Sequence, residues 1–185
     1  MILVVIDMQK GLVDEELYDC DAFVERVVRL IGAARDHGVE VLFVQHDAGP
    51  DSGMSTGDED FELVDEVAPA EGERVFVKTI NSSFGNKDFA AYLEQQADKR
   101  LMIVGLQTDF CIDATVKSAF ERGYEVIVPE GTNSTFDNDC VTGEIAYRYF
   151  NEEIWPGCFA DCVTFEDALE LLGEKALPHV GSGGQ

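Results

Sequence analysis

The sequence has few basic residues and lacks any long apolar run. Thirteen Lys and Arg stand against thirty-seven Asp and Glu, which gives a formal net charge of -24 and a pI near 4.1. A chain of this charge repels nucleic acid and anionic membrane surfaces, so we expect neither as a partner. No apolar run approaches the roughly 20 residues of a membrane-spanning helix. These absences argue against nucleic-acid-binding and membrane proteins.

Paired cysteines, a leader segment and nucleotide-binding motifs are also missing. The five cysteines are scattered, with no CxxC pair, which fits reduced thiols better than a disulfide framework. The first six residues lack the basic flank of a signal peptide, and Asp7 interrupts them early, so we expect a cytoplasmic protein. The turn at residues 7–11 contains neither GxGxxG nor a phosphate loop, which argues against nucleotide-dependent chemistry.

The size and the distribution of charge bound the architecture. A chain of 185 residues with 45% hydrophobic content supports one sizeable core. We expect one domain over residues 1–180 and a disordered Gly-rich tail over residues 181–185. The acidity is spread through every segment. General solubility and adaptation to high salt, which screens self-repulsion, remain alternative explanations of it.

Apolar runs of strand length alternate with segments of helical spacing. Six runs predict strands at residues 3–6, 39–44, 75–77, 101–104, 126–128 and 158–163. Helical spacing predicts helices at residues 23–37, around 89–93, and at 112–122, 137–150 and 165–172, the last one capped by Thr164 with Asp167 at its third position. Strands that are apolar throughout are typical of a parallel sheet covered on both faces. We therefore predict a three-layer α/β/α fold around a six-stranded parallel sheet.

Three chemically active residues follow predicted strands. Asp7 comes after the first, Lys78 after the third, and Cys111 lies beyond the fourth, where a helix begins. Ligands bind at the carboxyl ends of strands in such sheets. A helix start also favours a thiolate and an oxyanion. Taken singly, the three are explained by a turn cap, a solvated cation and a core thiol. Their joint position favours a catalytic site.

The motifs around these residues resemble the isochorismatase-like cysteine hydrolase family. They read VIDMQ at residues 5–9, VK at 77–78 with SF at 83–84, and GLQTDFC at 105–111, followed by Thr115, Ala119 and Gly123-Tyr124. The resemblance runs from residue 3 to about residue 172. It implies a Rossmann-like six-stranded sheet, an Asp7-Lys78-Cys111 triad, a cis peptide between Leu106 and Gln107, and a homodimer or larger homo-oligomer.

Two departures within this resemblance narrow the chemistry. Metal-binding nicotinamidases of the family carry Asp-x-His and a further His after the second strand, whereas only His46 is available here, so we expect no metal and no cofactor. True isochorismatases replace the nucleophilic cysteine, and Cys111 is present. The resemblance thus implies hydrolysis of a small amide or other C–N bond, as in nicotinamidases and carbamoylsarcosine amidases, over vinyl-ether cleavage.

The expected reaction passes through a thioester. Asp7 accepts the thiol proton, Lys78 supplies positive charge, and the backbone N–H groups of Gln107 and Cys111 hold the oxyanion. Asp109 and Asp113 oppose thiolate formation unless they face away. A non-catalytic small-molecule binder and a redox sensor built on Cys111 are the alternatives from other classes.

The substrate is a small molecule that the sequence does not identify. Apolar or ring-stacking walls are candidate roles of four aromatic residues, with core packing as the alternative for each, and two polar residues are candidates for hydrogen bonds to the substrate. These candidates are Phe61, Phe84, Phe110, Phe136, Gln45 and His46. A long acidic loop, residues 47–60, is a candidate lid, and its charge favours a cationic or neutral substrate.

Overall fold

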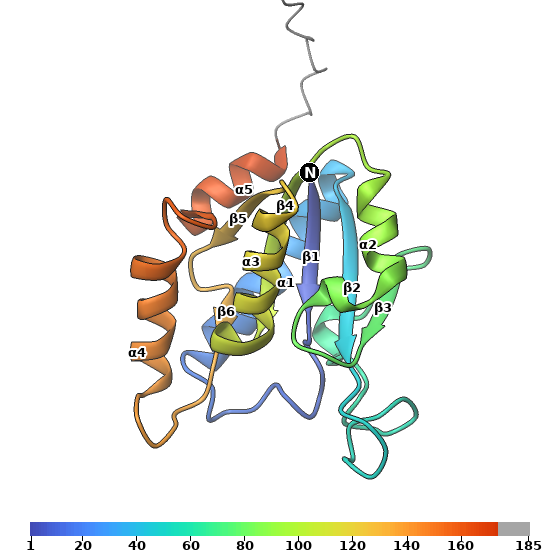
Figure 1. Ribbon diagram of the computed structural model, residues 1–185, viewed down its shortest axis with the longest axis vertical. Coiled ribbons are helices and arrows are strands. Elements are labelled where there is room, and N and C mark those ends of the chain that lie inside the picture. Colours follow the sequence, from blue (N-terminus) through green and yellow to red (C-terminus); the bar gives the residue numbers. More distant parts are fainter. Residues whose placement is uncertain (174–185) are drawn as a thin grey trace, which may run out of the picture.

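Seven parallel strands form one sheet in the structure, a computed structural model that describes residues 1–173 (Figure 1). The strand order is β3-β2-β1-β4-β5-β7, with β6 pairing beside β4. The strands are β1 (Ile2–Ile6), β2 (Glu40–His46), β3 (Arg74–Lys78), β4 (Arg100–Leu106), β5 (Glu125–Pro129), β6 (Asn133–Ser134) and β7 (Asp161–Val163). The predicted parallel sheet is confirmed, and β6 is an additional strand that its two polar residues did not reveal.

Helices cover both faces of the sheet. The α-helices are α1 (Cys20–His37), α2 (Lys87–Glu94), α3 (Asp113–Glu121), α4 (Gly143–Arg148) and α5 (Phe165–Gly173). Two 3₁₀ turns and two π-helical segments accompany them, namely η1 (Asp65–Val67), η2 (Ser83–Gly85), η3 (Thr108–Ile112) and η4 (Tyr149–Ile154). None of the helices within residues 1–173 is both long and apolar enough to cross a membrane.

Alternate residues of β1 divide the core into two halves. Leu3 and Val5 pack with α1 and α5, whereas Val4 and Ile6 pack with α2 and α3 on the opposite face. Every side chain of β1 is buried, because helices cover both faces of this central strand. The result is the predicted three-layer α/β/α arrangement (Figure 1).

The helix predicted at residues 137–150 begins later than expected. Asn138 accepts hydrogen bonds from the backbone N–H groups of Cys140 and Val141, and such local bonds compete with helix formation. Thr142 then caps α4 through the N–H of Ile145, and the chain continues into η4. The predicted cap of α5 by Thr164 is confirmed by a 3.1 Å bond from the N–H of Asp167. The predicted tail, residues 181–185, lies outside the described residues.

The strand order creates a site at the carboxyl edge of the sheet. Successive connections lead from β1 toward β3 on one side and from β4 toward β7 on the other. The switch point between these two halves lies between β1 and β4, where ligands bind in folds of this kind. Residues at or just beyond the carboxyl ends of β1, β3 and β4 therefore meet at one edge, at the lower end of the strands in Figure 1.

Candidate active site

The ammonium group of Lys78 stands at the centre of a buried cluster. Its Nζ donates to Oδ2 of Asp7 at 2.7 Å and lies 3.2 Å from Sγ of Cys111. It also lies 3.0 Å from Nδ1 of His46. Asp7 and Lys78 are 0% and 1% exposed, and Cys111 is 9% exposed. The structure therefore brings the three predicted triad residues together and adds His46 to them.

Backbone geometry positions the carboxylate and the ammonium group. Asp7 follows β1 in the left-handed region, with φ of 53°, and its N–H donates to the carbonyl of Val44 at 2.8 Å. Non-glycine residues in this region cluster at functional sites. Lys78 is the last residue of β3 and lies in register with His46 of β2. Adjacent strand ends thus place the His46 and Lys78 side chains side by side.

The segment between β4 and α3 carries the thiol. Gly105 has φ of +121°, and a Cβ there would lie 1.9 Å from the carbonyl oxygen of Ile6, so only glycine permits this approach of β4 to β1. The Leu106–Gln107 peptide bond is cis. The π-helical turn η3 follows at once and contains Cys111, which packs into the core half that α2 and α3 cover.

A buried polar network holds this segment from the side of β6. Thr108 donates to Oδ1 of Asn133 at 2.7 Å, and Asn133 and Asn151 exchange two amide hydrogen bonds of 3.0 Å. Asn151 also donates to the carbonyl of Tyr147 at 2.9 Å. The β6 strand pairs with Gly105 and Leu106. This network, which no sequence pattern predicts, connects η3 to α4 and η4.

Burial favours a state of the Asp7, Lys78 and Cys111 cluster that has no net charge. Burial raises the pKa of Asp7, although Lys78 opposes the rise. Burial also raises the pKa of Cys111 to about 12, the charge of Asp7 adds to this, and Lys78 lowers it. A carboxylate, an ammonium group and a thiol sum to zero, whereas a carboxylate beside a thiolate leaves one net negative charge in a buried site. Internal transfer of the thiol proton to Asp7 preserves the neutral total.

The two neighbouring carboxylates are engaged elsewhere. Asp109 accepts a 2.6 Å hydrogen bond from the hydroxyl of Thr135. Asp113 accepts from the indole N–H of Trp155 at 2.9 Å and from Lys117 at 2.8 Å. Neither is among the causes that raise the pKa of Cys111.

Two glutamines form hydrogen bonds to the residues that flank the acidic loop. Oε1 of Gln9 accepts from the N–H of His46 at 2.7 Å, and its Nε2 donates to the carbonyls of His46 and Phe61. Gln45, a candidate substrate ligand, donates its Nε2 to the same carbonyl of Phe61 at 2.8 Å. The amide N–H of Gln45 is therefore bound within the chain. The role of Gln9 was missed, although it lies in the motif that follows β1.

The four candidate aromatic residues lie in different surroundings. Phe84 packs between Phe89 and Tyr124, with ring centroids 5.3 and 5.7 Å away. Phe136 packs against the core half that α1 and α5 cover, opposite Cys111. Phe61 is buried, and Phe110 is 53% exposed in the same π-helical turn as Cys111. The structure thus does not gather the four rings into one wall.

A metal ion in the cluster would compete with Lys78. One ligand atom each from Asp7, His46 and Cys111 lies within 4.8 Å of the others. Each of these three residues has an atom within 3.2 Å of Lys78 Nζ. The ammonium group therefore already occupies the position between the three potential metal ligands. The donor set therefore does not fit a resident metal ion while Lys78 keeps its charge.

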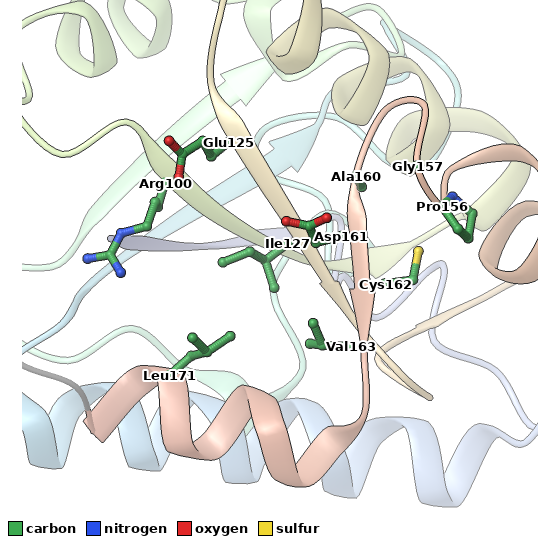
Figure 2. Close-up of a pocket in the computed structure, with 10 residues that line it drawn as sticks. All are labelled: Arg100, Glu125, Ile127, Pro156, Gly157, Ala160, Asp161, Cys162, Val163 and Leu171. Atoms are coloured by element: carbon green, nitrogen blue, oxygen red, sulfur yellow. The ribbon is translucent and has the colours of Figure 1, made fainter.

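A separate hollow of about 560 Å³ lies away from this cluster (Figure 2). It lies at the β5–β7 side of the sheet, and Figure 2 shows Asp161, Cys162 and Val163 of β7 above Leu171 of α5. Arg100 and Glu125, which begin β4 and β5, place it toward the amino ends of these strands. No triad residue lines it.

The fold is a parallel α/β sheet, and a thiol, an ammonium group and a carboxylate are buried at its carboxyl edge. Together they are typical of an α/β enzyme. The chain belongs to the isochorismatase family of hydrolases, because residues 1–164 match the family's Isochorismatase domain. It is 32% identical to the isochorismatase family protein YddQ of Bacillus subtilis, over 72% of this chain and 77% of that protein. The family resemblance predicted from the motifs is confirmed.

Two further comparisons extend over most of the chain. The ureidoacrylate amidohydrolase RutB of Methylorubrum extorquens is 24% identical over 96% of this chain and 86% of that protein. The crystal structure of a hydrolase of the isochorismatase family from Chromobacterium violaceum superposes with a TM-score of 0.85 at 26% identity, covering 93% of both chains.

Proposed function

We propose that this hydrolase cleaves a small amide or related C–N bond through a thioester on Cys111. The observation that carries the proposal is the position of Lys78, whose Nζ lies 2.7 Å from Asp7 and 3.2 Å from Cys111. A nucleophile, a base and a cation that stabilises them lie within hydrogen-bonding reach, as covalent catalysis requires.

The first step is proton transfer within the cluster. Oδ2 of Asp7 is bound to Lys78, whereas Oδ1 is buried and has no hydrogen-bond partner among residues 1–173. Oδ1 accepts the thiol proton as the Cys111 thiolate forms beside Lys78. The total charge stays neutral during this transfer, so no net charge is created in the buried site.

The thiolate then attacks the carbonyl carbon of the substrate. The resulting oxyanion accepts hydrogen bonds from the backbone N–H groups of Gln107 and Cys111, each worth about 3 kcal/mol where such donors have been measured. The C–N bond breaks as Asp7 returns its proton to the departing nitrogen. Water, activated by Asp7, then hydrolyses the thioester and releases the carboxylic acid.

Cleavage of a C–N bond is favoured over vinyl-ether cleavage by the thiol itself. Vinyl-ether hydrolysis is acid chemistry that needs no acyl-enzyme, whereas Cys111 is held beside Lys78 at 3.2 Å. The name of the related amidohydrolase RutB supports the same class of bond. We propose that neither a metal nor a cofactor takes part.

Several features support a cationic or neutral small-molecule substrate. The chain carries a net charge of -24, which disfavours a polyanion. Among the candidate side chains, Phe110 is the exposed one that shares a helical turn with Cys111, so we propose it as a contact for the apolar part of the substrate. Gln9 binds the carbonyls of His46 and Phe61, which flank the loop at residues 47–60, and we propose this loop as a lid over the site.

A homo-oligomer is the proposed assembly, and the cytoplasm the proposed location. Ile145 of α4 is 55% exposed, and Val141 before this helix and Tyr149 after it are 36% and 54% exposed. We propose that these exposed apolar side chains contribute to the subunit interface. Light scattering of the wild type and of Ile145→Glu tests this proposal, which predicts a dimer or larger species that the charge disrupts.

Release of ammonia or an amine from a panel of small amides tests the proposed reaction. We expect turnover by the wild type and no measurable turnover by Cys111→Ala. Cys158→Ala is the matched control, because Cys158 is an exposed thiol outside the cluster. Turnover by Cys111→Ala at the wild-type rate, or turnover of vinyl ethers alone, would contradict the proposal.

A further inference from the structure

The contact between His46 and Lys78 is not used by the proposed reaction. Nζ of Lys78 lies 3.0 Å from Nδ1 of His46. An ammonium group has three hydrogens to donate and accepts none, so Nδ1 of His46 is the acceptor and is unprotonated. The remaining ring hydrogen of this neutral imidazole is therefore on Nε2.

This contact completes the hydrogen bonding of Lys78. The three acceptors within 3.2 Å are Oδ2 of Asp7, Sγ of Cys111 and Nδ1 of His46, one for each hydrogen of the ammonium group. A buried charge needs each of its hydrogen bonds satisfied. His46 thereby fixes the direction in which Lys78 faces the thiol and the carboxylate.

We propose that His46 is a positioning residue that holds Lys78 by an unprotonated Nδ1, and that protonation of His46 switches the thiol site off. This inference rests on the proposed role of Lys78 beside Cys111. A protonated imidazole has two N–H groups and no acceptor, so it releases Lys78 and places a second cation against it.

The surroundings of His46 favour the neutral ring. The groups that face the imidazole are Lys78 from β3, Asp7 after β1 and the Cys111 thiol, together with Asp47, the residue after His46. Burial lowers the pKa of His46 first and the charge of Lys78 second, while Asp7 and Asp47 oppose the shift. Since the pKa lies below its ordinary value, the bond to Lys78 is present at neutral pH and is lost as the pH falls.

Alkylation of Cys111 by iodoacetamide, followed by mass spectrometry between pH 4 and pH 9, tests the inference without any amide substrate. His46→Ala removes the acceptor, and we expect alkylation at pH 7.5 to slow about tenfold, the effect of losing one hydrogen bond to a charged group. His46→Asn keeps an acceptor near the position of Nδ1 and should restore most of the rate. Because Asn does not titrate, the fall in rate at acid pH should move to lower pH.

His37→Asn is the matched control, since His37 is an exposed histidine of α1 whose Nδ1 lies 2.9 Å from the carbonyl of Ala33. Unchanged alkylation in His46→Ala, or an unchanged acid limb in His46→Asn, would overturn the inference. If His46→Ala does not fold, the acid limb of His46→Asn decides alone. An absence of amide turnover with the expected alkylation profiles would count against the proposed function and leave the role of His46 standing.

With an amide that the wild type turns over, the same variants separate positioning from binding. We expect His46→Ala to lower kcat about tenfold and to change KM less than threefold, since Lys78 acts on the thiol and not on the bound substrate. A raised KM at unchanged kcat would show that His46 binds substrate instead, and would overturn the positioning role.

Discussion

The carboxylate of Asp7 is divided between two functions. Its Oδ2 accepts a 2.7 Å hydrogen bond from Lys78, while Oδ1 is buried and no group in the described part of the chain donates to it. A buried carboxylate oxygen without a partner costs free energy of folding. The sequence retains it beside Cys111, where it is available to accept the thiol proton.

Replacing Asp7 by Asn tests this division. The amide keeps the shape of the side chain and an oxygen for Lys78, but it is not a base. We expect kcat for amide hydrolysis to fall about 10²- to 10⁴-fold, the usual contribution of a general base. Asp36→Asn, an exposed change on α1, serves as the control. Retention of more than a tenth of the wild-type kcat by Asp7→Asn would show that another group accepts the proton.

The amide pair of Asn133 and Asn151 should stabilise η3 through Thr108. Asn133→Ala leaves two buried partners without their hydrogen bonds, and we expect a loss of roughly 1–3 kcal/mol in the free energy of unfolding, together with a lower kcat. Urea unfolding of Asn133→Ala, of Asn151→Ala and of the double variant measures the coupling between the two residues. Strict additivity of the two single effects would mean that the residues do not act as a unit.

Gly105→Ala and Gly123→Ala separate a steric requirement from a conformational one. Both positions have positive φ, but only at Gly105 does an added Cβ meet backbone, 1.9 Å from the carbonyl oxygen of Ile6. We expect Gly123→Ala to cost about 1 kcal/mol and Gly105→Ala about 4 kcal/mol or more, since β1 and β4 must separate. Thermal unfolding compares the two, and equal losses would contradict this reading of the β1–β4 contact.

Asp47 should order the loop at residues 47–60 through its charge. Its carboxylate accepts from the hydroxyl of Ser55 at 2.7 Å and from the N–H of Gly49 at 2.9 Å, and these bonds lower its pKa to about 2. Since the pKa is lower in the folded chain, the contribution is complete above pH 4 and is lost as the pH falls through about 2. Asp47→Asn should speed hydrogen exchange of the loop amides at pH 7.

Asp51→Asn is the control for this prediction, because Asp51 is an exposed residue of the same loop. Equal exchange rates in Asp47→Asn and the wild type would show that the loop is ordered by other contacts.

The sequence predicted those features that depend on long patterns or on strand ends. Continuous apolar runs predicted six of the seven strands. The runs are most complete in β1, β2, β4 and β5, which are buried on both faces, whereas the edge strands β3 and β7 are partly exposed. Asp7, Lys78 and Cys111 were predicted to meet because each lies at or beyond the carboxyl end of a strand of one parallel sheet. The position of the acidic groups Asp109 and Asp113 required the structure, since their partners Thr135 and Trp155 are distant in sequence.

The remainder depends on contacts with no local signature. β6 consists of two polar residues, and the π-helical turn η3 shows the same apolar spacing as an ordinary helix start. The side chain of Gln9 donates hydrogen bonds to His46 and Phe61, which lie 37 and 52 positions further along the chain. His46 was considered for its hydrogen bonds to substrate, but register between β2 and β3 directs its Nδ1 to Lys78. No single-sequence pattern records such pairings.

Intact-mass spectrometry of the protein quenched in acid during turnover detects the proposed thioester on Cys111 itself. We expect an added mass equal to the acyl part of the amide, located by peptide mapping on Cys111 and absent from the exposed Cys140 and Cys158. The same adduct should be missing in Cys111→Ala. Amide hydrolysis with no acyl adduct at any quench time, or an adduct that persists in Cys111→Ala, would contradict a thioester on Cys111.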